Sequence, residues 1–167
     1  MIPLKQWIKS GEGQYLFKQD EVELTSLFID YKSNDKKAVI TINGEVFTIL
    51  QTSFWKNHMA VTNASNNTII TIVPEKWYSS SFHVQWGATN YQLKIRNNPL
   101  AEWVLQQDGK DVLAYGLKTA YRKVVTQITE ANGDTAVILH AILWYLFWPI
   151  STEISGDNMM FLLMATA

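Results

Sequence analysis

The sequence contains no cysteine, which excludes disulfide bonds, thiolate catalysis and any zinc site that depends on sulfur ligands. Its three histidines, His58, His83 and His140, lie far apart and do not have the spacing of metal ligands. It also lacks the phosphate-binding loop, the nucleophile elbow and the paired histidines of zinc proteases. We therefore expect no cofactor and no metal, and we predict that the protein is not an enzyme.

An excess of charge of one sign is also missing. The chain carries 14 Lys and Arg against 15 Asp and Glu, a formal net charge of −1, and the two signs are interspersed. Nucleic-acid binding asks for more positive charge, so we expect no nucleic-acid partner. The densest acidic group contains Asp20, Glu21 and Glu23, of which the last two would share a strand face. A solvated face is a simpler interpretation of this group than a carboxylate pair for glycoside chemistry.

Long apolar runs are few, and the longest is DTAVILHAILWYLFWPI. A run that is apolar on every side predicts an enclosed helix from about 134 to 148, with Asp134 capping its start and Pro149 ending it. Its helical residues span about 21 Å, which is short of the bilayer core of about 30 Å. We therefore expect the helix to be buried in protein, with His140 as a neutral, hydrogen-bonded core residue.

A second apolar stretch, residues 159–167, leaves another interpretation open, in which it inserts into lipid together with the helix. Packing against the protein core is the simpler interpretation, because methionine commonly fills gaps in cores. Residues 1–13 lack the continuous apolar core of a signal peptide. We therefore expect a cytoplasmic protein, peripheral to a membrane if it docks there, and the composition predicts no particular oligomeric state.

Short strands broken by turn signals fill the chain from about residue 14 to about residue 129. The clearest turn is Asn43-Gly44, a dipeptide that tolerates the positive φ angles of a two-residue type I′ hairpin. The strand spacing of about 8–12 residues is typical of an all-β sandwich or barrel, since no helix lies between strands to make the sheet parallel. The expected strands from Gly44 onward cover residues 45–51, 58–63, 68–73, 80–86, 90–96, 101–107, 111–117 and 121–129.

These features combine into one domain over residues 1–167. A closed antiparallel sheet leaves an interior wide enough for a helix, and closure removes the exposed sheet edges. A helix that is apolar on every side, placed after the last strand, fits such an interior. We predict a mostly β fold, a single antiparallel β-barrel of about 10–12 strands that encloses a hydrophobic C-terminal α-helix.

The segments of the second half follow one another as NYQLKIR, AEWVLQQ, the turn DGK, DVLAYGL, YRKVVTQIT and the apolar helix. In this order and character the chain resembles the tubby C-terminal-like superfamily, which includes LURP-one-related proteins and phospholipid scramblases. The resemblance implies a β-barrel of roughly twelve strands around a hydrophobic C-terminal helix. The stretch after the helix departs from that pattern. The sequence also contains no calcium-binding loop, so we do not expect the calcium binding of the scramblases here.

Basic residues on the predicted outer strand faces form the candidate binding set. Lys94 and Arg96 are two residues apart, so both point outward, opposite the apolar Ile95 between them. Some tubby-like proteins bind phosphoinositide headgroups with basic side chains on the barrel surface, and the resemblance implies the same use here. An ordinary solvated face is the simpler interpretation of these side chains. The full candidate set for an anionic headgroup is Lys94, Arg96, Lys118, Arg122 and Lys123.

Two functions of different classes remain open. The first is a non-enzymatic, tubby-like barrel that docks on anionic phospholipid headgroups or on a protein partner. The second is a barrel that binds a small apolar ligand in its interior, in the manner of a lipocalin, with the helix outside. Room inside the barrel separates them, because a helix that fills the interior leaves no cavity of the about 300–1,000 Å³ typical of ligand sites.

Overall fold

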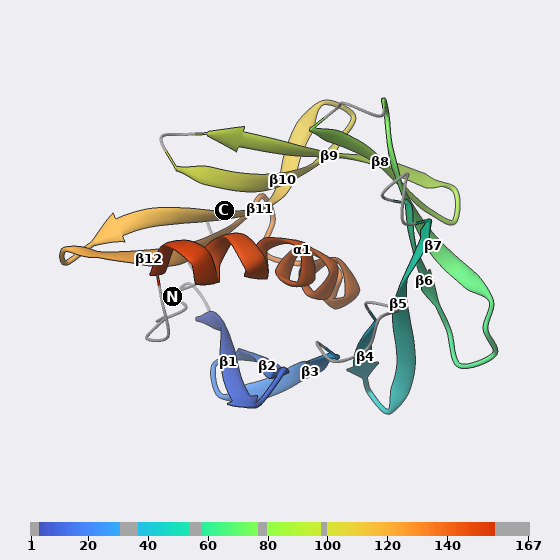
Figure 1. Cartoon of the computed structure of the whole chain (residues 1–167), viewed down its shortest axis with the longest axis horizontal. Helices are drawn as coiled ribbons and strands as arrows, with labels where there is room; N and C mark the ends of the chain where they lie inside the picture. The colour runs from blue at the N-terminus through green and yellow to red at the C-terminus, as the bar shows by residue number, and fades with distance from the viewer. Residues whose placement is uncertain (1–3, 31–36, 54–57, 77–79, 98–99, 156–167) are drawn as a thin grey trace.

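The fold is one curved β-sheet with a helix inside its curve (Figure 1). The computed structural model describes residues 4–30, 37–53, 58–76, 80–97 and 100–155, so the apolar stretch at 159–167 lies outside the described residues. The predicted mostly β fold with a C-terminal helix after the last strand is confirmed for the described residues. The described elements are β1 (Lys5–Gly11), β2 (Gln14–Gln19), β3 (Val22–Ile29), β4 (Ala38–Ile42), β5 (Glu45–Ser53), β6 (His58–Thr62), β7 (Thr68–Pro74), β8 (Ser81–Trp86), β9 (Thr89–Asn97), β10 (Ala101–Gln107), β11 (Lys110–Ala120), β12 (Lys123–Glu130) and α1 (Val137–Ser155).

Each strand pairs antiparallel with the next one along the chain, so the order in the sheet runs from β1 to β12 without a crossover. Such a meander needs only short connections, and hairpin turns supply them. Among the described residues no backbone ladder joins β1 to β12, so the predicted closure into a barrel is not confirmed. Figure 1 shows the two edge strands on the same side of the curve.

The turn dipeptides explain many of the strand boundaries. Asn43 and Gly44 have φ angles of 50° and 80°, as a type I′ hairpin requires, and β4 pairs with β5 across them. Asp108 and Gly109, with φ angles of 52° and 76°, join β10 to β11 in the same way. Glycine reaches this region at no steric cost, and Asn and Asp tolerate it through their short polar side chains. The predicted hairpin at Asn43-Gly44 is confirmed.

Helix α1 differs from the prediction at both ends. It begins at Val137, so the exposed Asp134 lies outside the first turn and does not cap it. The carboxylate of Glu130, instead of that of Asp134, accepts a hydrogen bond from the backbone just before the helix, from the N–H of Thr135 at 3.4 Å. The helical backbone also continues through Pro149 to Ser155. A proline removes one backbone hydrogen bond, and here the backbone remains helical on both sides of it.

Helix α1 is the centre of the hydrophobic core. Residues 138–144 are all buried, and the helix contacts β3 and β4 on one side and β10, β11 and β12 on the other. The ring of Trp144 stacks on Trp7 of β1 with centroids 5.5 Å apart and meets Tyr15 of β2 edge-on at 5.7 Å. Aromatic pairs in these arrangements stabilise a core beyond the area that they bury. The predicted burial of the apolar helix in protein is confirmed.

Candidate functional site

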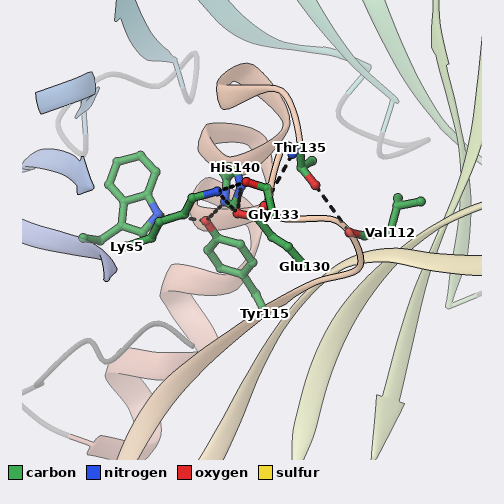
Figure 2. A network of polar contacts seen from close by, with 8 residues as sticks. Lys5, Val112, Tyr115, Glu130, Gly133, Thr135 and His140 are labelled. Carbon is green, nitrogen blue, oxygen red and sulfur yellow. Dashed lines mark hydrogen bonds and ion pairs between the residues drawn. The ribbon is translucent and has the colours of Figure 1, made fainter. Parts of the chain in front are cut away.

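A buried network of polar side chains joins the two edge strands of the sheet to the helix (Figure 2). Lys5 comes from β1, Glu130 ends β12 and His140 lies in α1. The Lys5 ammonium lies 2.5 Å from Oε1 of Glu130 and donates to the carbonyl oxygen of Gly133 at 2.8 Å. These side chains therefore connect β1 to β12 at the edge where the described residues form no backbone ladder.

Hydrogen bonds set the orientation of His140. The indole N–H of Trp7 donates to the hydroxyl oxygen of Tyr115 at 2.9 Å. The Tyr115 hydroxyl donates its own hydrogen to Nδ1 of His140, 2.8 Å away, because the other ring nitrogen faces the carboxylate of Glu130, which can only accept. Nε2 of His140 then carries the ring hydrogen and lies 2.7 Å from Oε1 of Glu130, close but poorly aligned for a hydrogen bond. We call Lys5, Trp7, Tyr115, Glu130 and His140 the seam network.

Burial and charge act against each other on the ionisable groups of the seam network. Burial by itself raises the pKa of Glu130, but the contacts and charges of His140 and Lys5 outweigh it and lower that pKa to about 2. Burial lowers the pKa of His140 by more than the Glu130 carboxylate raises it. His140 is therefore neutral at neutral pH, which confirms the predicted hydrogen-bonded core histidine, and Lys5 and Glu130 form the ion pair.

The seam network is built for stability and offers no access to a substrate. The side chains of Glu130 and His140 are 0% exposed, and that of Lys5 is 6% exposed. A general acid or base must come within hydrogen-bond reach of its substrate, directly or through a water molecule. Removing one partner of a buried ion pair is strongly destabilising, because the other charge is left uncompensated. We therefore assign the seam network to holding the edge strands and α1 together.

The predicted basic residues of β9 and β11 lie on the outer face of the sheet. Arg96 pairs with Glu102 of β10, which pairs with Gly116 of β11, so these three positions share one face. Lys94 and Lys118 are each two residues from this row along their own strands, so they share the same face. The outward direction expected for Lys94 and Arg96 is therefore correct, and Lys118 joins them.

Arg96 is engaged with two carboxylates on this outer face. Its Nε lies 2.8 Å from Oε1 of Glu102, and one Nη lies 3.0 Å from Oδ2 of Asp111. Partial burial opposes the charge, but the hydrogen bonds and charges of the two carboxylates raise the pKa of Arg96. Gln106 also donates to Asp111, at 2.7 Å, and so orients one of these carboxylates. The positive charge of Arg96 is balanced where it stands and is poorly placed to attract an external anion.

Lys118, Arg122 and Lys123 gather at the far end of the β11–β12 hairpin. The pairing of β10 with β11 extends only to Gly116, so beyond it the hairpin continues as a two-stranded arm. Lys118 and Lys123 lie on the two strands of this arm, and Arg122 lies in its turn. Figure 1 shows the hairpin projecting past the neighbouring strand β10. We call residues 118–125 the basic arm.

Lys94 lies apart from the basic arm. It pairs with Val104, which pairs with Ala114, four residues before Lys118 along β11. Four residues of a strand span about 13 Å. The structure therefore divides the predicted set into three cations that share the arm, an ion-paired Arg96 and a separate Lys94.

A groove of about 420 Å³ lies on the outer face beside the arm. The groove depends on the missing side chain of Gly116. A Cβ added there would come within 2.9 Å of Cβ of Glu102 and would crowd the groove wall. The charged residues of its wall are one carboxylate, Glu102, and one ammonium, Lys118, so the groove has no excess of either sign. Its lining comprises Leu100, Glu102, Ala114, Gly116, Leu117, Lys118, Thr119, Gln127 and Thr129.

The acidic group near the start of the chain does not form a carboxylate pair. Asp20 and Glu21 occupy the β2–β3 turn with φ angles of 49° and 72°, and Asp20 accepts the backbone N–H of Leu4 at 2.9 Å. The turn removes Glu21 from the strand face that it was expected to share with Glu23. Within the described ranges, no three His, Asp or Glu side chains gather as a metal site. In the same part of the chain no helix is long and apolar enough to cross a membrane.

The sequence pattern missed two features of these regions. It did not predict β1, because the inward positions of that strand hold Lys5 beside Trp7 and so obscure the apolar alternation. It also began the last strand at Tyr121, whereas β12 begins at Lys123. Tyr121 and Arg122 instead form the turn, with φ angles of 51° and 62°. Neither is a usual turn residue, so the aromatic ring was the stronger signal, and it favoured a strand.

Comparisons of the chain with protein-family models, with curated proteins and with solved structures returned no match. What this chain does must therefore be inferred from its own residues. Among them, the basic arm gathers three cations on a projecting hairpin, and we take it as the candidate binding site.

Proposed function

We propose that this chain is a non-enzymatic, tubby-like β-barrel that docks on anionic phospholipid headgroups through its basic arm. Twelve described antiparallel strands in sequence order, followed by a buried apolar helix, support the tubby-like barrel. In this proposal the barrel closes between β1 and β12 through the seam network, which spans both edge strands. The protein is then a peripheral module, with its core occupied and its function on the outside.

The observation that carries the docking proposal is the charge of the basic arm. Between Asp111 and Glu130 the chain holds three cations and no acid, although the whole chain has a net charge of −1. Arg binds phosphate oxygens through a planar fork of donors, and Lys adds a compact point charge. Each such residue near an anionic membrane surface contributes about 1 kcal/mol of attraction. The arm therefore supports a weak, reversible and salt-sensitive attachment.

The position of α1 argues against an interior ligand. A lipocalin-like carrier needs an open interior, with the helix outside, whereas residues 138–144 are buried inside the curve of the sheet (Figure 1). The groove of about 420 Å³ beside the arm, and a second of about 180 Å³ next to it, both lie along β10–β12 and include the outward-facing Glu102 in their walls. These observations favour a function on the outer surface.

Charge reversal within the arm tests the docking proposal. Arg122→Glu combined with Lys123→Glu removes two of the three cations, and we expect the affinity for phosphatidylserine-containing vesicles to fall by about 30-fold or more. Thermal stability should stay nearly unchanged, because both side chains are exposed. Cosedimentation with phosphatidylcholine vesicles, with and without phosphatidylserine and at low and moderate salt, measures the binding.

A matched control separates a local site from the net charge of the chain. Lys9→Glu combined with Lys110→Glu makes the same change in net charge at two exposed lysines outside the arm. We expect this control to keep most of its binding. If the wild type does not bind anionic vesicles even at low salt, or if both double variants lose binding equally, docking through the arm is wrong.

A further inference from the structure

We infer that Tyr121 is the interfacial anchor of the basic arm, with its ring entering the headgroup region of an anionic bilayer while Arg122 and Lys123 bind the phosphates. The inference rests on the proposed docking function and names the side chain that makes apolar contact with the lipid. Three features of the turn support it: its backbone conformation, the exposure of the ring and the charge of its neighbours.

The backbone of the β11–β12 turn is strained. Tyr121 and Arg122 both adopt left-handed φ angles, 51° and 62°. This region crowds a β-carbon against the following carbonyl oxygen, and Gly, Asn and Asp tolerate it best. The comparable hairpin turns of this chain are Asp20-Glu21, Asn43-Gly44 and Asp108-Gly109, and each of them begins with Asn or Asp. The Tyr121-Arg122 turn is the one of these four that contains neither Asn, Asp nor Gly, and such outliers point to a function for the side chains that they present.

Tyr121 is 99% exposed, which is the highest value for any large hydrophobic residue among those described. The ring therefore contributes no packing to the folded protein. Tyrosine combines an apolar body with a polar tip and concentrates where a bilayer meets water. At the end of a projecting hairpin, such a ring is placed to reach the interface before the rest of the sheet.

Charge complementarity favours a bilayer as the partner. Arg122 follows Tyr121 directly, Lys123 opens the next strand, and no acid lies closer in sequence than Asp111 and Glu130. An acidic protein surface would also attract these cations, but it would need a shaped pocket to bury the ring. A bilayer interface accepts an aromatic ring without such a pocket. Electrostatic attraction combined with apolar insertion is also the pairing of signals that peripheral membrane attachment requires.

Replacement of the ring tests the inference. Tyr121→Asn suits the left-handed turn better than tyrosine, so we expect a higher melting temperature together with severalfold weaker binding to phosphatidylserine-containing vesicles. The salt dependence should stay that of the wild type, because the cations remain. Tyr121→Phe keeps the ring and should bind nearly as the wild type does. Val22→Asn removes another exposed apolar side chain, far from Tyr121 in the sequence, and should leave binding unchanged.

A label at the turn reports insertion directly. The chain has no cysteine, so Tyr121→Cys and Val22→Cys each accept one environment-sensitive fluorophore. We expect the emission of the label at 121 to shift to the blue on anionic vesicles, while the label at 22 does not respond. Salt-sensitive wild-type binding that Tyr121→Asn leaves intact, or a label at 121 that stays in water on bound vesicles, overturns the anchor and leaves the docking function standing. Absence of wild-type binding overturns both.

Discussion

The seam network and the basic arm use similar side chains in opposite environments. In the seam network, Lys5 is buried beside Glu130, at 2.5 Å, and also bonds the carbonyl of Gly133. In the basic arm, Arg122 and Lys123 are exposed, and neither forms an ion pair with another described residue. A buried and balanced charge holds two strands together, whereas an exposed and unbalanced charge is available to a partner.

Arg96 lies between these two extremes. Its side chain is 39% exposed, yet two carboxylates lie within 3.0 Å of its guanidinium. In the sequence alone it looked equivalent to Lys118 or Arg122 as a candidate for an anionic headgroup. The comparison shows that the nearest acid decides what a surface cation can do, and that acid comes from a neighbouring strand.

The largest effect is expected from breaking the seam network. Glu130→Leu leaves the Lys5 ammonium buried without its carboxylate, and we expect this to lower the free energy of unfolding by about 3–5 kcal/mol. Chemical denaturation of the wild type and the variant measures the change. A loss below about 1 kcal/mol, the value of an ordinary surface pair, would contradict the role of the network.

A double variant sharpens this prediction. Lys5→Met combined with Glu130→Leu removes both charges and leaves apolar side chains of similar size. Because replacing a buried ion pair with apolar residues is often neutral, the double variant should recover most of the stability lost by Glu130→Leu. If the double variant is as unstable as the single one, the shapes of these side chains hold the edge, and their charges do not.

Acid should weaken the seam network and leave the charges of the basic arm in place. The pKa of His140 is lowered by burial, so below its ordinary value of 6.5 the unfolded chain takes up a proton that the folded chain resists. The pKa of Glu130 falls from 4.5 to about 2, so its contribution, on the order of 3 kcal/mol, is present above pH 4.5 and is lost as the pH falls through about 2. Denaturation curves across this range should show stability decreasing steadily.

The double variant Lys5→Met with Glu130→Leu serves as the control for the acid prediction. It lacks the Glu130 carboxylate, so its stability should change less between pH 4.5 and about 2 than that of the wild type. Parallel curves for the two proteins would show that other carboxylates govern the acid transition.

The smallest effect is expected at Arg96. Glu102→Gln removes one of its two carboxylates, and since the pair is partly exposed we expect a loss of stability of no more than about 1 kcal/mol. The remaining partner, Asp111, still holds the guanidinium, so vesicle binding should rise by no more than about fivefold. A larger gain in cosedimentation would move the docking surface from the basic arm to the face around Arg96.

Local patterns predicted most of the fold. Turn dipeptides such as Asn43-Gly44 set hairpin positions, because only a few residues tolerate the φ angles of those turns. Turn signals on both sides placed strands such as β10 (Ala101–Gln107), whose bounds match the prediction. The apolar run placed the helix, although its ends were wrong at Asp134 and Pro149. In each case the information lies within a few residues of sequence.

The remaining features depend on contacts between distant residues. Lys5 and Glu130 are 125 positions apart, so no local pattern links them, and a buried lysine hides the strand that carries it. The neutralisation of Arg96 depends on the register of β9, β10 and β11, which brings Glu102 and Asp111 to it. Tyr121 entered a turn against its own preference for a strand, because the pairing of β11 with β12 sets where the hairpin ends.

Hydrogen exchange with and without phosphatidylserine-containing vesicles tests the central claim most directly, that the helix is internal and the basic arm is the contact surface. Without vesicles, we predict strong protection of amides 138–147. On adding vesicles, we predict slower exchange confined to residues 118–125, with the helix unchanged. Rapid exchange in the helix that slows only with vesicles, or no change in the arm of a vesicle-bound protein, would contradict the account.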